Sequence, residues 1–233
     1  MKASLARRAT AEAIGTAMLL AAVVGSGIMG ERLSGGNVAI ALLANTLATG
    51  AALVALILTF EGISGAQFNP AVSLTAAWQG GLPWRDVPVY VLAQIVGALA
   101  GVVTAHLMFG LPLFSASRHV RTGGAQLFSE FIATFGLLTV IWGCVRFRPQ
   151  AVAFAVAAYI MAACWFTSST SFANPAVTFA RSMSDTFAGI RLGDTPGFLI
   201  AELAGAAAAT ILFRWLASTS TGRDAVSREE END

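Results

Sequence analysis

Six long apolar runs constrain what this chain can fold into more than any other feature. A transmembrane helix needs about 20 consecutive apolar residues, and only 12% of the residues are charged, against roughly 25% in a soluble domain. The sequence therefore predicts an all-α membrane protein with six transmembrane helices surrounded by membrane lipid. The expected spans lie at about 10–29, 38–60, 87–109, 125–145, 150–166 and 196–216. The net charge of +1 gives no indication of nucleic acid, and no nucleic-acid partner is expected.

The tripeptide Asn-Pro-Ala occurs twice, each time just after an apolar run and each time followed by Val. Proline is well tolerated at the first helical position, because its missing N–H would be unpaired there anyway. Asn is a favoured N-cap. The sequence therefore predicts two short half-helices, over about 69–79 and 174–184, that meet in the middle of the membrane. The motif residues expected at this point are Asn69, Pro70, Ala71, Asn174, Pro175 and Ala176.

The chain also contains an internal repeat. The segment 11–16, with Glu12, resembles 129–134, with Glu130, and each is followed by two apolar runs, an Asn-Pro-Ala and a further run. Three spans in each repeat is an odd number, so the two halves must enter the membrane from opposite sides. Such an inverted repeat places its interrupted segments at the site of binding or permeation.

The predicted organisation has three parts. Residues 1–9 form a cytoplasmic N-terminus, 10–216 a channel domain, and 217–233 a cytoplasmic, disordered tail. Within the channel domain, repeat 1 covers about 10–109 and repeat 2 about 125–216.

Positive charge indicates the orientation. Nine Lys and Arg side chains fall on one predicted side and five on the other. The richer side is expected to be cytoplasmic, with both termini inside and the chain in the plasma (inner) membrane. The basic start could instead belong to a signal peptide, but Glu12 interrupts its apolar run, and the recurrence of the pattern favours a first transmembrane helix.

The paired motifs, the Glu near the start of spans one and four, and the segment Ile63–Val72 together resemble the aquaporin and aquaglyceroporin (major intrinsic protein) family. The resemblance covers about 8–216. The second motif, Phe172–Val177, is most similar to rhizobial aquaglyceroporins found beside arsenic-resistance genes. The resemblance implies an aquaporin-like fold of six spans and two half-helices, a homotetramer with one pore per subunit, and no cofactor. No metal-ligand spacing is present in the sequence, so no bound metal is expected.

The resemblance also implies roles for four polar residues. Asn69 and Asn174 would donate hydrogen bonds to a passing solute, while the positive ends of the half-helices repel cations; a purely structural cap is the alternative. Glu12 and Glu130 would accept hydrogen bonds from the re-entrant loops, since ionisable groups at membrane depth are usually functional or paired. A proton relay through them is the less favoured alternative.

The outer selectivity filter is where this chain departs from the family. The common pattern has Arg three residues after the second motif's Asn, and this chain has Val177 there. Ala162 is placed less securely than the other filter positions, and Met161 or Ala163 could replace it. The expected filter is Thr49, Ala162, Ser171 and Val177.

Arg181 lies four residues after Val177, so it can share the same helix face one turn further on. We expect it at the outer mouth. It could meet solvent, pair with Asp185, or bend back toward the filter.

Small filter residues widen the constriction, and losing Arg removes a fixed charge and a rigid set of donors. The sequence therefore favours a passive channel for small neutral solutes: glycerol and trivalent metalloid hydroxides (arsenite, antimonite), with some water. The alternatives are a mainly water-selective channel and an inverted-repeat secondary transporter. An enzyme is not expected, because no paired catalytic groups are visible. Cys144 and Cys164 are expected to be packed thiols.

Overall fold

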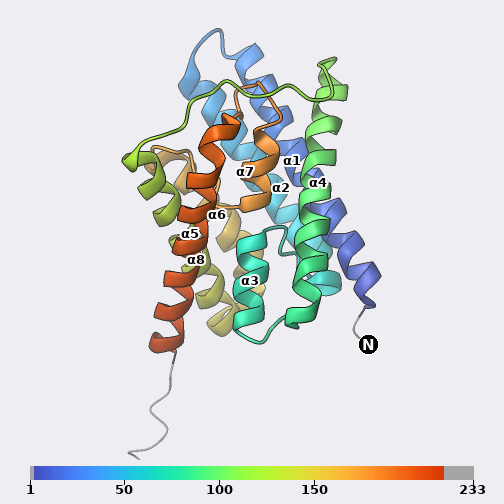
Figure 1. Ribbon diagram of the computed structural model, residues 1–233, viewed down its shortest axis with the longest axis vertical. Coiled ribbons are helices and arrows are strands. Elements are labelled where there is room, and N and C mark those ends of the chain that lie inside the picture. The colour runs from blue at the N-terminus through green and yellow to red at the C-terminus, as the bar shows by residue number, and fades with distance from the viewer. Residues whose placement is uncertain (1–2, 218–233) are drawn as a thin grey trace, which may run out of the picture.

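The computed structural model describes residues 3–217, and within this range every regular element is helical. Figure 1 shows the long helices running side by side along the longest axis of the molecule. Six of them are long and apolar enough to cross a membrane. They are α1 (Leu5–Leu33), α2 (Val38–Ser64), α4 (Val87–Phe109), α5 (Gly124–Phe147), α6 (Val152–Phe166) and α8 (Thr195–Leu216).

Two short helices lie between the long ones, α3 (Pro70–Trp78) and α7 (Pro175–Arg181). Their N-caps are Asn69 and Asn174, with extended backbones at φ −154° and −159°, and proline follows at the first helical position. Figure 1 shows α7 above α3 inside the bundle. The predicted half-helices are therefore present, and each begins at its predicted residue.

Some predicted boundaries are wrong. α1 begins at Leu5, before the expected residue 10, because the Ser4 side chain caps it by accepting a hydrogen bond from the Arg7 N–H. α7 ends at Arg181 instead of 184, because the chain turns there: the N–H of Ser184 donates to the Arg181 carbonyl. Three 3-10 turns, η1 (Trp84–Asp86), η2 (Pro149–Ala151) and η3 (Leu192–Asp194), precede α4, α6 and α8. Apart from Ala217, the predicted tail at 217–233 lies outside the described residues.

The two repeats pack in the same way. α1 packs against α2 and α4, and α5 packs against α6 and α8. A Cβ atom on Gly97 would lie 2.2 Å from the carbonyl oxygen of Ala13, and a Cβ on Gly205 would lie 2.3 Å from that of Phe131. Ala13 and Phe131 follow the repeated glutamates directly. The same close helix crossing therefore occurs in both halves.

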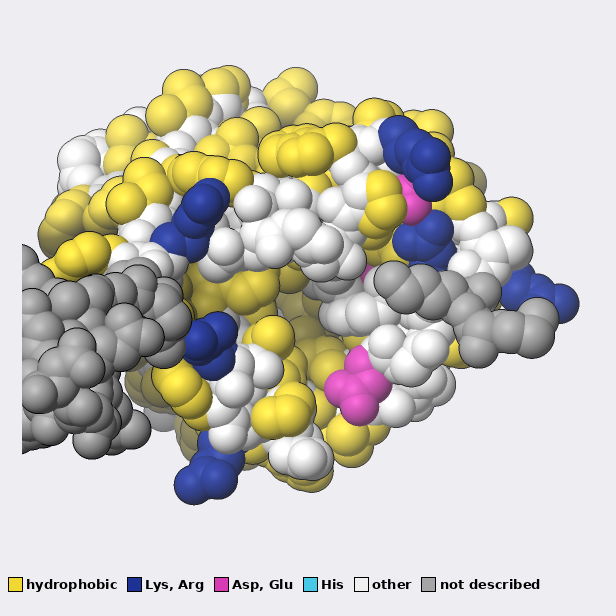
Figure 2. Space-filling view, turned by 90° about the horizontal axis from the view of Figure 1, so that it is seen from below, with side chains coloured by type: hydrophobic (Ala, Val, Ile, Leu, Met, Phe, Trp, Pro, Cys, Tyr) yellow, Lys and Arg dark blue, Asp and Glu magenta, His cyan; other side chains and the backbone are white. Residues whose placement is uncertain are grey.

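The chain begins and ends its described part at the same end of the bundle, the lower end in Figure 1. There the Arg8 guanidinium bonds Asp86 at 2.8 Å, and Arg146 donates to the carbonyl of Ala217. Seen from that end in Figure 2, basic side chains lie on both sides of a central hollow, an acidic side chain lies at its rim, and hydrophobic side chains show in its wall. The hollow leads toward the two half-helices.

The close crossing at Gly97 gives a first prediction. Gly97→Ala should destabilise the fold by about 1–3 kcal/mol, because the added methyl meets backbone and cannot be accommodated without a shift of α1. The apparent melting temperature of the purified protein in detergent measures this loss. Gly62→Ala, in α2, is the matched control, since nothing lies within 4 Å of its Cβ position. Equal melting temperatures for the two variants would contradict the prediction.

Candidate functional site

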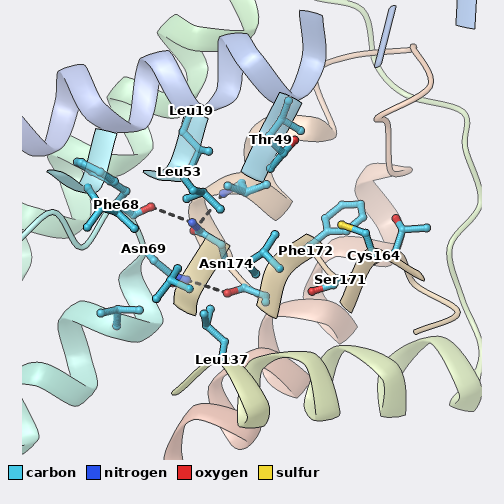
Figure 3. A pocket seen from close by; sticks show the side chains of 18 of the residues that line it. Leu19, Thr49, Leu53, Phe68, Asn69, Leu137, Cys164, Ser171, Phe172 and Asn174 are labelled. Carbon is cyan, nitrogen blue, oxygen red and sulfur yellow. Dashed lines mark hydrogen bonds between the residues drawn. The ribbon is translucent and has the colours of Figure 1, made fainter. Parts of the chain in front are cut away.

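The tips of the two half-helices are joined by a reciprocal pair of hydrogen bonds. Asn69 Nδ2 donates to the carbonyl of Ala173 at 2.7 Å, and Asn174 Nδ2 donates to the carbonyl of Phe68 at 2.8 Å (Figure 3). Each Oδ1 accepts from its own helix, from Ala71 N–H or Ala176 N–H. A side-chain amide has two N–H hydrogens, so each Asn keeps one beyond the bond to the opposite loop.

The loops before the two motifs have an unusual backbone. Among the described residues, five that are not glycine have positive φ, between 45° and 64°. They are Ala66, Phe68, Thr170, Ser171 and Ala173. Such conformations cost on the order of 1–3 kcal/mol each and persist only where the surroundings hold them. The carbonyls that accept from the two Asn side chains belong to Phe68 and Ala173, which are two of these residues.

Glu12 holds the first loop. One of its oxygens accepts from Ser64 Oγ at 2.6 Å and from Gln67 N–H at 3.0 Å. The other accepts from Phe68 N–H at 2.6 Å and from Gln94 Nε2 at 2.9 Å. Glu12 is fully buried, so this carboxylate is stabilised by four donors instead of water.

Glu130 holds the second loop in the same register. It accepts from Phe172 N–H at 2.9 Å and from Ala173 N–H at 2.8 Å. Behind it, Glu202 accepts from Asn174 N–H at 3.2 Å and from Thr178 Oγ1 at 2.5 Å. The structure thus places Glu12 and Glu130 against the re-entrant loops, which is the position that the family resemblance implies.

A single cavity of about 650 Å³ passes the two Asn side chains. One face of α2 lines it from Val38 to Glu61, a rise of about 35 Å at 1.5 Å per residue. The hydrocarbon core of a bilayer is about 30 Å thick. The cavity is therefore long enough to connect the two sides of a membrane.

Three of the four predicted filter residues line this cavity: Thr49, Ser171 and Val177. Ala162 does not line it and is exposed on the outer face of α6, so its assignment is wrong. Neither Met161 nor Ala163 takes its place. α6 lines the cavity through residues at four-residue steps, Val152, Val156, Ile160 and Cys164.

Cys164 therefore occupies the position predicted for Ala162. The connection from α6 to the second motif is two residues shorter than the spacing carried over from the family. Two residues turn a helix by about 200° at 3.6 residues per turn. Because the loop is shorter, the residue that the family spacing assigns to the cavity lies on the outer face of α6, and the residue two positions later faces the cavity.

Arg181 also lines the cavity, and only 7% of its surface is exposed. Its Nε donates to the carbonyl of Ala188, and its Cζ lies 3.3 Å from the ring centre of Phe172. It does not pair with Asp185, which binds Arg118 at 2.8 Å instead. Of the predicted alternatives, the structure shows the guanidinium bent back onto the cavity wall, one turn outside Val177.

A second arginine reaches this region from the segment between α4 and α5. Arg121 donates to the carbonyls of Gly189 at 2.8 Å and Ser169 at 3.0 Å, and its Cζ lies 5.1 Å from the ring centre of Phe172. Loss of hydration lowers the pKa of Arg121, against the attraction of Glu130. A guanidinium remains charged at neutral pH. The outer part of the cavity wall thus carries two cations.

Several site residues were missed by sequence reasoning: Gln94, Arg121, Cys164, Phe172 and Glu202. A signal existed for two of them. Gln94 lies eight residues after Asp86 and Glu202 eight after Asp194, and each Asp stands two residues before a proline. An alignment of the two repeats through Asp-x-Pro would have placed both at the buried loops.

The glutamate contacts give a second prediction. Glu12→Gln should lower the apparent melting temperature and the yield of folded protein, because the new amide N–H faces backbone N–H donors. We expect a loss of about 1–3 kcal/mol, measured by thermal unfolding in detergent. Glu31→Gln, on an exposed residue of α1, is the matched control and should melt like the native protein. An unchanged melting temperature for Glu12→Gln would contradict the role of Glu12 in holding the loop.

Comparison with known proteins assigns the chain to a family. The family model described as Major intrinsic protein matches residues 1–146. The chain is 57% identical over 212 residues to aquaglyceroporin AqpS of Rhizobium meliloti (strain 1021), covering 91% of each chain. It is 37% identical over 176 residues to aquaporin NIP1-4 of Oryza sativa subsp. japonica, covering 70% of this chain and 60% of that one.

A solved structure supports the fold. The aquaglyceroporin from Plasmodium falciparum superposes with a TM-score of 0.71 at 22% identity, covering 90% of this chain and 96% of that chain. The match to the family model and the extended identity to AqpS decide the assignment. The chain belongs to the major intrinsic protein family.

Proposed function

We propose that glycerol and the trivalent metalloid hydroxides arsenite and antimonite, together with some water, cross the membrane passively through the cavity of this chain. As a member of its family the chain is a multi-pass membrane channel for small neutral solutes and not an enzyme. The named cargo is the part that we propose. Its relative of 57% identity is an aquaglyceroporin by name, which supports glycerol as a solute.

The observation that carries the choice of cargo is Val177 on the cavity wall. This position follows the second Asn by three residues, where the family pattern has Arg. Thr49, Cys164 and Ser171 line the cavity beside it, and all four side chains are small. The Phe172 ring also lines the cavity near these residues, but small side chains at these four positions leave room that supports solutes larger than water. A neutral trihydroxide or triol carries no charge, so it needs no charged side chain at this level of the cavity to compensate it.

The middle of the cavity has both polar and apolar surface in its wall, and this combination supports the same cargo. Figure 3 shows the amides of Asn69 and Asn174 close to Leu19, Leu53 and Leu137, and all five residues line the cavity. The amides offer N–H donors on one side, and the leucines offer an apolar surface. A polyol with hydroxyl groups and carbon atoms can satisfy both. The positive ends of α3 and α7 meet here, which opposes the passage of cations.

We also propose the setting of the channel: a homotetramer in the plasma (inner) membrane, with both termini in the cytoplasm. The termini of the described part share one end of the bundle (Figure 1), and the basic side chains gathered there support a cytoplasmic location. Exposed apolar side chains such as Leu43, Leu47, Phe154 and Ile200 lie on the outside of the long helices. These faces are available to lipid and to neighbouring subunits.

Val177→Arg tests the proposed cargo. The longer, charged side chain should narrow the cavity and reduce glycerol and arsenite flux about tenfold, equivalent to about 1.4 kcal/mol of added barrier. Water flux should fall much less. Stopped-flow light scattering of proteoliposomes measures swelling in glycerol and shrinkage for water, and arsenite uptake is measured on the same vesicles.

Val177→Thr is the control, because it keeps the shape of valine without a charge, and its fluxes should stay near native values. Equal losses of water and glycerol flux in Val177→Arg would count against the assigned filter. No glycerol or arsenite uptake by the native chain would overturn the proposed cargo, and uptake against a gradient would indicate a transporter.

Asn174→Asp tests the meeting point of the half-helices. Asp remains a good N-cap, but it removes the Nδ2 donor to Phe68 and adds negative charge at the helix tip. We expect the proton leak of proteoliposomes to rise at least about tenfold. Asn37→Asp, at the exposed N-cap of α2, should leave the leak unchanged. A native leak in Asn174→Asp would argue that this amide does not face the solute.

A further inference from the structure

We propose that Arg181, and not the residue three positions after the second Asn, carries the outer barrier against cations in this channel. The inference rests on the proposed function, because a barrier matters only where neutral solutes pass. In this proposal Arg181 selects solutes by charge, whereas Val177 and its neighbours set the width of the cavity.

The position of Arg181 is the first argument. It lies four residues after Val177 on α7, and both residues line the cavity, so the guanidinium-bearing residue is about 6 Å further out along the helix. Figure 3 shows Phe172, the ring on which it rests, beside Cys164 and Ser171. A solute that passes these residues also passes Arg181.

The hydrogen bonds of Arg181 are the second argument. Its Nε is bound to the carbonyl of Ala188, and the flat guanidinium lies on Phe172. Within residues 3–217, neither terminal nitrogen makes a hydrogen bond, and neither is among the buried atoms left without a partner. The side chain is 93% buried as a whole, from its exposure of 7%. Its terminal nitrogens therefore open onto the cavity, where they can donate to a passing oxygen.

The third argument is charge. Among the described residues no carboxylate lies within salt-bridge distance of Arg181. The two acidic groups of the outer loops are engaged elsewhere: Asp185 binds Arg118, and Asp194 binds Arg191. Arg121 adds a second cation around the same Phe172 ring. Neither Arg181 nor Arg121 forms a salt bridge among the described residues. In a wall of low dielectric constant the two guanidinium groups together give a positive potential, which repels cations that enter from outside.

The consequence is that positive charge and side-chain bulk, which an arginine in the filter would combine, lie at different levels of this channel. An arginine at position 177 would supply charge and bulk at the same level. Here the charge lies one turn outward and is held flat against Phe172, while Val177 leaves the filter level uncharged. The channel can therefore admit a broad neutral solute and still oppose cations.

The test compares Arg181→Gln and Arg181→Met with Arg181→Lys in proteoliposomes. Proton and sodium leaks are measured with internal indicator dyes, and glycerol swelling is measured on the same vesicles per folded channel. We expect both uncharged variants to raise the cation leaks at least about tenfold and to keep glycerol flux within about twofold. Arg181→Lys, which restores the charge, should stay near the native leak.

Arg118→Gln is the matched control, since its side chain is exposed and lies in the same outer region. Native glycerol flux tests the proposed function by itself, so its absence is distinct from a failure of this inference. A native leak in folded Arg181→Gln or Arg181→Met would overturn the inference. Loss of folding in all three variants, Lys included, would also overturn it in favour of a structural role.

Discussion

The reciprocal hydrogen bonds between Asn69, Asn174 and the opposite loops are the interaction on which the rest of this structure depends. Each amide caps its own half-helix and also binds the carbonyl just before the other one. Neither half-helix is long enough to be stable alone in water. Joined at their tips, they connect the two repeats, and they hold two positive helix ends together that would otherwise repel each other.

Those bonds require the loop carbonyls to point in an unusual direction. The buried glutamates hold the loops in the backbone conformation that turns the carbonyls this way. Phe68 and Ala173 have left-handed backbones, and their N–H groups point at Glu12 and Glu130. The strain of the loops is therefore offset by charge-assisted hydrogen bonds, which are stronger than neutral ones. The same arrangement occurs twice because the repeat brings a glutamate to each loop from the opposite side.

Local signals made most of this predictable. Hydropathy placed the six long helices, and Asn before Pro placed the start of both half-helices, because each depends on residues close in the sequence. The resemblance to the family then implied that Glu12 and Glu130 hold the two re-entrant loops. The unequal pair behind them, Gln94 in one half and Glu202 in the other, required an alignment of the last helix of each repeat.

The errors in the predicted site arise where the length of a loop or the torsion of a side chain determines the position of a residue. Ala162 was misplaced because two residues fewer in a connection rotate α6, and a sequence spacing cannot show that phase. The direction of Arg181 depends on Phe172 and Ala188, which reach it through tertiary packing. Arg121 belongs to an irregular segment, and no periodic pattern indicates which way such a segment folds over the bundle.

The short fifth span has a consequence for the lipid around the protein. η2 and α6 together extend about 28 Å, whereas α2, with 27 residues, extends about 40 Å. A hydrophobic helix shorter than the bilayer draws the membrane thinner beside it, and a longer one tilts or reaches into the headgroups. We therefore expect the lipid annulus around one subunit to be uneven, and thinnest along α6. If another protein surface covered α6 in place of lipid acyl chains, the bilayer would not have to become thinner there.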